Sequence, residues 1–324
     1  MNRYRLLHVT TFDYDGPVTE SYNEVRLRPM QDDLQSCLSF RLSTEPNSRP
    51  SVHHDFFGNW VYQFNVLGEH RHLRIEADSI VLVQAPLQPV HGGAPLADLA
   101  GLRDELHEEF YDLLIQTSYV PHPASLSWLL ALAEQESNGT SLGYVEALTR
   151  QIHSKFRYEK GATHVQSSVL DALGRGAGVC QDFAHLLIAA ARMRGLPARY
   201  VSGYLVPRKT AEPGASVEEV IGGQASHAWA EVFVPGLDWI GFDPTLGQPV
   251  GLQHVRLAYG RDYGDVAPVR GVYKGHAGQR LSVDVRVRPA LNDEGYEEFQ
   301  ETAAGPPIEV AENEPAQQQQ QQQQ

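Results

Sequence analysis

The chain has 324 residues, of which 42% are hydrophobic and 20% are charged, as is typical of a globular protein long enough for two domains. Its formal net charge is −14, but eight of the acidic residues fall within residues 291–324, which contain no Lys or Arg. The first 290 residues are therefore only mildly acidic. They show no basic stripe, which argues against nucleic acid or an anionic membrane as a partner.

The sequence contains no signal for a membrane or for export. No apolar run approaches the roughly 18 residues that a membrane helix needs. The basic start Met1–Arg5 is not followed by the apolar core of a secretory signal. The two cysteines, Cys37 and Cys180, are expected to be free thiols in a reducing compartment. We therefore expect a cytoplasmic protein.

The first 90 residues favour strands. Short runs that alternate polar and apolar residues, separated by turn residues, predict a small antiparallel β domain over residues 1–90. The runs are 4–10, 24–28, 38–42, 61–66, 73–77 and 80–83. Residues 84–101 are rich in Pro and Gly and are typical of a linker.

Helices are predicted next. Residues 91–145 are expected to hold the linker and helical segments, and residues 146–290 the functional core. The predicted helices cover 102–114, 124–133, 143–156 and a segment that begins at Cys180. In this last helix apolar residues recur with the 3.6-residue period, and Gly195 and Pro197 supply the stop signal.

The second half of the core is predicted to be mostly strands. They cover 198–206, 226–234 and 239–243, and a shorter segment over 281–287 is expected to rejoin a sheet. The polar residues 207–225 are predicted to form a loop. Residues 291–324 are acidic, contain Pro and end in eight glutamines, a composition that predicts a disordered tail.

Three residues in this core could form a nucleophilic relay. Cys180 lies at the predicted first turn of a helix, where unpaired N–H groups and a partial positive charge favour a thiolate. Pro235-Gly236 predicts a hairpin turn. With residue 235 at its centre, His227 lies directly opposite Asp243, with Cβ atoms about 4.5–5.5 Å apart. An imidazole can take the thiol proton, and a carboxylate can fix the imidazole's tautomer.

Other interpretations of these residues remain open. Cys180 alone could be a buried structural thiol. A zinc site made of Cys180, His227 and Asp243 lacks an evident fourth ligand, so we expect no metal and no cofactor. The backbone N–H of Cys180 is a natural oxyanion donor, but a second donor is not evident. His185 is expected to be a packed, hydrogen-bonded residue.

Three further residues are candidates for substrate binding. Trp229 would either shape the acyl pocket or pack within the sheet. Tyr158 and His164 precede the helix of Cys180 and are candidates to line the cleft. Asp182, in the first turn of that helix, is expected to stabilise the helix N-terminus.

Four motifs carry a family resemblance. They are Gly178–His185, Gly195–Tyr204, Ser226–Val232 and Trp239–Thr245. In this order they resemble the transglutaminase-like superfamily, in the bacterial branch that carries an N-terminal β domain. The resemblance implies an α+β fold with a papain-like core, in which a helix delivers the nucleophile Cys180 against an antiparallel sheet that delivers the base His227 and its orienting partner Asp243.

The resemblance leaves the reaction open. We expect a cysteine peptidase or amidase that acts on amide bonds of peptides or proteins through a thioester at Cys180. The alternatives are a protein-glutamine γ-glutamyltransferase, in which an amine takes the acyl group, and a non-catalytic protein-binding scaffold. The sequence shows no acidic calcium-loop spacing of the kind that a calcium-dependent enzyme would need.

Overall fold

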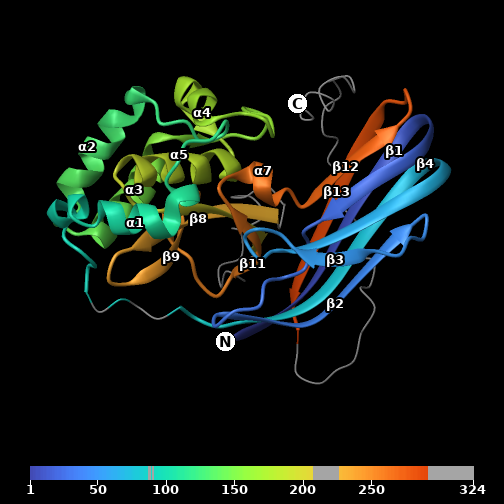
Figure 1. Cartoon of the computed structure of the whole chain (residues 1–324), viewed down its shortest axis with the longest axis horizontal. Coiled ribbons are helices and arrows are strands. Elements are labelled where there is room, and N and C mark those ends of the chain that lie inside the picture. Colours follow the sequence, from blue (N-terminus) through green and yellow to red (C-terminus); the bar gives the residue numbers. More distant parts are fainter. Residues whose placement is uncertain (87–88, 90, 207–225, 291–324) are drawn as a thin grey trace, which may run out of the picture. The chain divides into compact units, whose positions relative to one another are not determined.

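The structure is a computed structural model that describes residues 1–86, 89, 91–206 and 226–290 (Figure 1). The chain divides into two compact units. We call them the β unit, which comprises Met1–Gln84 and residues 267–290, and the α+β unit, which comprises Ala85–Leu205 and Ser226–Val266. The predicted loop over 207–225 and the predicted tail over 291–324 lie outside the described residues.

The β unit is one antiparallel sheet. Two 24-residue strands, β1 (Asn2–Val25) and β4 (Trp60–Val83), pair with each other along most of their length. β2 (Gln35–Glu45) and β3 (Ser51–His54) pair with β4. On the other side, β12 (Val269–Lys274) and β13 (Gln279–Pro289) pair with β1. In Figure 1 these two orange to red strands lie beside the blue β1.

The N-terminal β domain is therefore present, but its strands are longer and its boundary differs from the prediction. The runs 4–10 and 24–28 are both parts of β1, and the runs 61–66, 73–77 and 80–83 are all parts of β4. Polar and Gly residues inside these strands resemble turn signals, yet the chain continues through them as one strand, and the pairing of β1 with β4 only shifts its register between Asp13 and Glu20.

The C-terminal strands also belong to the β unit. Residues 281–287 do rejoin a sheet, as predicted, but they do so in β13, which pairs with β1 from Tyr4 to Tyr14. The core placed at 146–290 consequently ends earlier, at Val266, and the helices between 91 and 145 belong to it. The local sequence could not predict this assignment, because the paired residues of β1 and β13 lie more than 260 positions apart in the chain.

The α+β unit is built on a five-stranded antiparallel sheet with the order β10-β9-β8-β7-β11. Its strands are β7 (Ala198–Leu205), β8 (Ser226–Val234), β9 (Asp238–Asp243), β10 (Gln248–Pro249) and β11 (His254–Gly260). The three strands predicted here, over 198–206, 226–234 and 239–243, are confirmed as β7, β8 and β9.

Helices complete this unit. They are α1 (Arg103–Phe110), α2 (Ser127–Glu136), α3 (Ser141–Lys155), α4 (Val169–Arg175), α5 (Cys180–Met193) and α7 (Tyr263–Val266). Short 3₁₀ turns are η1 (Leu96–Ala100), η2 (Tyr111–Leu113) and η3 (Ala124–Leu126). α5 packs against β7 and β8, and both α3 and α4 pack against α5.

The central helix α5 begins and ends where the sequence predicts. Most of its apolar residues, among them Phe183 and Leu187, are fully buried in the core of the unit, and Met193 is partly buried. At its end Gly195 has φ +88°, a conformation that glycine adopts without strain. The Gly195 N–H donates to Arg192 O and the Leu196 N–H donates to Ala191 O, which satisfies the last carbonyls of the helix. A stable buried helix thus holds its first residue, Cys180, in a fixed place.

Candidate active site

Cys180 sits at a junction of two elements. The short strand β6 (Ala177–Gly178) runs directly into α5, and β5 (Arg157–Tyr158) pairs with it, with Tyr158 beside Gly178. Cys180 is the first residue of the helix and is half-buried. Its N–H is one of the four amides that have no acceptor inside a helix. A thiol and an available backbone donor therefore occur in the same residue.

Asp182 fastens this end of the helix. Its Oδ2 accepts from the Val179 N–H at 2.8 Å and from the Thr163 hydroxyl at 2.5 Å. A Cβ on Gly178 would lie 2.7 Å from the same oxygen, so the approach of carboxylate and backbone requires glycine there. Burial raises the pKa of Asp182. The prediction that Asp182 stabilises the helix N-terminus is confirmed.

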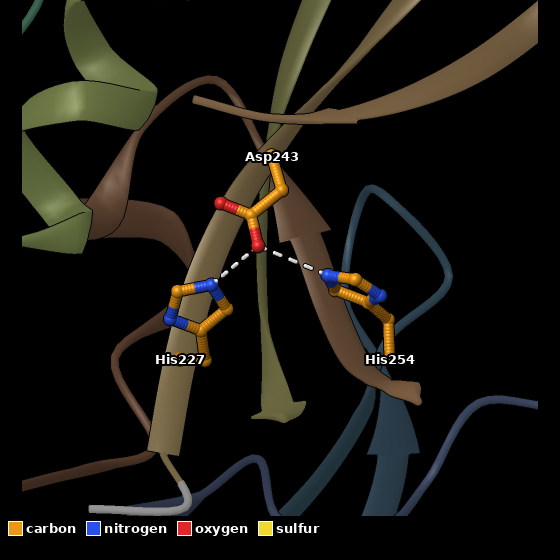
Figure 2. A group of neighbouring side chains, drawn as sticks. All are labelled: His227, Asp243 and His254. Atoms are coloured by element: carbon orange, nitrogen blue, oxygen red, sulfur yellow. Dashed lines mark hydrogen bonds and ion pairs between the residues drawn. The ribbon is translucent and has the colours of Figure 1, made fainter. Parts of the chain in front are cut away.

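His227 and Asp243 form a buried pair. His227 is the second residue of β8 and Asp243 is the last residue of β9. The Asp243 Oδ2 lies 2.7 Å from His227 Nε2, and neither side chain is exposed (Figure 2). The other oxygen, Oδ1, accepts from the backbone N–H groups of Thr245 at 2.9 Å and Leu246 at 3.1 Å. These bonds orient the carboxylate toward the imidazole.

The predicted register of the hairpin is wrong by two residues. Val234 pairs with Asp238, so the turn is centred on Gly236, which has φ +86°, and not on Pro235. His227 and Asp243 are consequently diagonal neighbours and not directly opposed. A shift of two keeps both side chains on one face of the sheet, whereas a shift of one would have separated them. The predicted contact between His227 and Asp243 is therefore present, because a two-residue error in the register leaves both side chains on the same face.

The electrostatics of the pair favour a charged imidazole. Burial lowers the pKa of His227, but the carboxylate of Asp243 and the thiolate of Cys180 outweigh this effect and raise it to about 10. Burial likewise opposes ionisation of Asp243, yet the positive charge of His227, followed by hydrogen bonds from His227 and His254, holds the pKa of Asp243 far below the usual range. At neutral pH the site therefore holds a carboxylate, an imidazolium and a neighbouring sulfur.

The contact between His227 and Cys180 is looser than that between His227 and Asp243. His227 Nδ1 is buried and has no partner at hydrogen-bond geometry among the described residues. The sulfur is nonetheless near enough for its charge to raise the pKa of His227. Nucleophile and base contacts are often long in unliganded enzymes and tighten when substrate binds.

His254, at the start of β11, is a site residue that the sequence analysis missed. Its Nε2 lies 3.0 Å from Asp243 Oδ2, the oxygen that His227 also approaches, and Figure 2 shows the carboxylate between the two imidazoles. Nothing in the local sequence marks it, because β11 is separated from β8 by β7 in the sheet. Only the strand order brings His254 to Asp243.

His227, Asp243 and His254 also form a cluster with the side chains that metals prefer, since their nearest ligand atoms lie within 4.8 Å of one another. The tautomer of His254 argues against a metal. The Gly251 N–H donates to His254 Nδ1 at 3.1 Å, so the ring proton must be on Nε2. A metal would need the lone pair of that Nε2. The geometry fits a hydrogen-bonded relay better than a metal centre.

The structure places the three weaker candidates differently. Trp229 is fully buried, with its ring centroid 5.1 Å from that of His254 and 6.2 Å from that of His227. This position favours the packing alternative. Its ring also lies over Gly203, where a Cβ would come within 2.4 Å of the indole. Trp229 thus supports the imidazoles from within the sheet.

Tyr158 remains close to the nucleophile. Burial, followed by the charges of Cys180 and Asp182, raises the pKa of its phenol, and its ring meets Phe183 edge-on at 6.3 Å. Its substrate-binding role stays a prediction. His164 is exposed, and its backbone N–H donates to Ser167 Oγ. His185 is packed as expected, with Nε2 accepting from the Tyr263 N–H at 3.2 Å.

Comparison with known proteins identifies the family. The model of the bacterial transglutaminase-like N-terminal region matches residues 4–82, and that of the transglutaminase-like superfamily matches residues 131–244. The second range contains Cys180, His227 and Asp243. The chain belongs to the transglutaminase-like superfamily. His254 lies beyond the matched range, so the family model does not account for it.

Relatives that match this chain over most of their length occur in mycobacteria. An uncharacterized protein of Mycobacterium leprae is 35% identical over 288 residues, which cover 89% of this chain and 99% of that one. An uncharacterized protein of Mycobacterium tuberculosis is 36% identical over 311 residues, which cover 90% and 94% of the two chains.

A solved structure supports the fold. A Cytophaga hutchinsonii protein, described as a candidate cysteine protease, matches with a TM-score of 0.67 at 22% identity and covers 93% of this chain and 95% of its own. The α+β fold with a transglutaminase-like core and an N-terminal β region is thereby confirmed. Family and fold together support a cysteine-dependent enzyme. Within the described residues, no helix is long and apolar enough to cross a membrane.

Proposed function

We propose that this transglutaminase-like protein hydrolyses amide bonds of peptides or proteins through a thioester on Cys180, in the cytoplasm and without a cofactor. One observation carries the proposal. A buried Asp243, held by four hydrogen bonds, keeps His227 protonated next to the sulfur of Cys180. A structural thiol has no need of a charged imidazole in a buried position, which is costly to maintain.

The first half of the reaction forms the thioester. His227 Nδ1 accepts the Cys180 proton, and the thiolate attacks the carbonyl carbon of the amide. The Cys180 N–H at the start of α5 donates to the developing oxyanion. The C–N bond then breaks, and His227 returns the proton to the leaving amine. Asp243 stays ionised throughout and holds the imidazole in place.

The second half consumes the thioester. His227, now neutral, takes a proton from water, whose oxygen attacks the thioester carbonyl. The C–S bond breaks, the carboxylic acid leaves, and the proton on His227 restores the ion pair with the Cys180 thiolate. If an amine attacks in place of water, the same steps give transamidation. The two reactions share their first half, and the acceptor alone distinguishes them.

Alkylation of the two cysteines tests the nucleophile directly. Burial raises the pKa of the half-buried Cys37, which therefore serves as an internal control in the same chain. Iodoacetamide at pH 7, followed by peptide mass spectrometry, should modify Cys180 at least about 10-fold faster than Cys37. Equal, slow modification of both would contradict an activated thiol.

Substrate profiling tests the reaction. Wild type should release new carboxyl termini or free carboxylates from a peptide and glutamine-protein panel, whereas Cys180→Ala should not and the matched Cys37→Ala should. Incorporation of ¹⁸O from labelled water identifies hydrolysis, and incorporation of a fluorescent amine identifies transamidation. Cleavage that persists in Cys180→Ala would disprove the proposal. Activity absent from wild type, with Cys180 inert to alkylation, would favour a binding scaffold.

A further inference from the structure

Two imidazoles converge on one carboxylate oxygen in this site, and the proposed chemistry uses only one of them. His227 Nε2 and His254 Nε2 lie 2.7 Å and 3.0 Å from Asp243 Oδ2. The two histidines come from β8 and β11, which are not neighbours in the sheet. Both imidazoles are completely buried. A second buried imidazole on the same oxygen calls for a function of its own.

The proton of His254 is placed by its other ring nitrogen. The Gly251 N–H donates to Nδ1 at 3.1 Å, and a backbone N–H can only donate. Nδ1 is therefore an acceptor and Nε2 carries the proton, which it donates to Asp243. A second proton on the ring would place an Nδ1–H donor opposite the Gly251 N–H donor, so the hydrogen bond between them would be lost. His254 is accordingly held as a neutral donor, unlike His227.

This donor completes the shell of Asp243. Oδ1 accepts from the Thr245 and Leu246 backbones, and Oδ2 accepts from His227 and His254. Two donors from different strands thus hold Oδ2. Without His254, three of the four hydrogen bonds would remain, Oδ2 would keep only the one from His227, and the carboxylate would be held less tightly. The ring of Trp229 packs against His254 and keeps that imidazole in place.

We propose that His254 is a positioning residue for the relay: as a neutral Nε2–H donor it locks the Asp243 carboxylate in the orientation that holds His227 toward Cys180. It contacts no reacting atom and acts through Asp243. Because this role has meaning only if Cys180 is the nucleophile, it rests on the proposed function.

Two amide substitutions separate the two hydrogen bonds of His254. The amide of Gln carries its nitrogen at the ε position and can keep the donation to Asp243. The amide of Asn ends at the δ position, so it can keep the contact with Gly251 but not reach Asp243. Both variants are polar and smaller than histidine, which makes His254→Gln and His254→Asn a matched pair for packing effects.

The readout is the rate of Cys180 alkylation by iodoacetamide from pH 5 to pH 10, with circular dichroism and thermal melting to check the fold. His254→Asn should lower the rate at pH 6.5 by about 10- to 100-fold, the loss expected for one hydrogen bond to a charged group. Its profile should shift to higher pH, because a loosely held Asp243 supports the imidazolium less. His254→Gln should stay within about 3-fold of wild type, with an unshifted profile.

His185→Leu is the control for losing any buried imidazole, since His185 also accepts a backbone N–H but makes no contact with Asp243 among the described residues. It should change the melting temperature without shifting the profile. Equal rates and profiles in the Gln and Asn variants, or a shift of the Asn profile to lower pH, would overturn the positioning role. Alkylation needs no substrate, so a slow Cys180 in wild type would instead refute the proposed nucleophile.

Discussion

Replacing the carboxylate at the centre of the relay gives the sharpest test of the electrostatic argument. Asp243→Asn keeps the size of the side chain and an oxygen that can still accept from the backbone N–H groups of Thr245 and Leu246. It removes the negative charge that faces His227 at 2.7 Å. The new NH₂ group would also face the Nε2–H groups of His227 and His254, and an amide NH₂ cannot accept a hydrogen bond from either. The expected result is a neutral His227 and a protonated Cys180.

The magnitude follows from the pKa of His227. A rise from 6.5 to about 10 corresponds to roughly 5 kcal/mol in favour of the charged imidazole, shared between Asp243 and Cys180. An adjacent opposite charge such as that of Asp243 accounts for about 1–3 pKa units of this rise. Each unit lost reduces the thiolate–imidazolium fraction up to tenfold. Alkylation of Cys180 at pH 6.5 should therefore fall by about 10- to 1,000-fold, and its pH profile should shift to higher pH.

The assay compares alkylation rates from pH 5 to pH 11 by mass spectrometry in a Cys37→Ser background. The matched control is Asp13→Asn, because Asp13 makes a 2.7 Å pair with His72 that is exposed and lies in the β unit. That control should leave the Cys180 profile unchanged. If a folded Asp243→Asn protein gave the wild-type profile, Asp243 would not set the charge of His227, and the relay as described would be wrong.

Three further predictions concern the surroundings of the site. Tyr158→Phe should raise KM for a cleaved peptide by about 2- to 12-fold with little change in kcat, if the phenol binds substrate through one neutral hydrogen bond; an unchanged KM would remove it from the site. Gly178→Ala should lower stability by about 1–3 kcal/mol in urea titrations because its methyl group would meet Asp182, whereas Gly174→Ala, which meets nothing within 4 Å, should not. Glu231→Gln should cost about 3–5 kcal/mol, because it removes the buried carboxylate charge that pairs with the half-buried Arg199 and Arg256, and a loss below 1 kcal/mol would contradict this.

The same Glu231 predicts how stability depends on pH. Burial opposes its ionisation, but Arg199 and Arg256 outweigh burial and lower the pKa of Glu231 in the folded state. A lowered folded pKa gives stability that is present above the unfolded pKa, near 4.5, and is lost as the pH falls through the folded pKa. Thermal melts at acid pH should show this loss in wild type and less of it in Glu231→Gln.

Much of the site was predictable because its signals are local. A 3.6-residue apolar period and a glycine at the end define α5, and both depend only on residues close in sequence. They place Cys180 at a helix N-terminus wherever that helix packs. Side chains alternate between the two faces along β8 and β9, so His227 and Asp243 lie on one face for any register that differs from the predicted one by an even number of residues. The residue types and their order then suffice to predict the relay and the family.

The tertiary structure decided what depends on distant pairing. It centred the hairpin turn on Gly236, assigned β13 to the β unit and joined the short runs of the first 83 residues into two long strands. It also brought His254 to Asp243, because the strand order places β11 next to β7 and two strands away from β8. Strand order and pairing are fixed by burial and hydrogen bonds summed over the whole sheet, and no local pattern of residues encodes them.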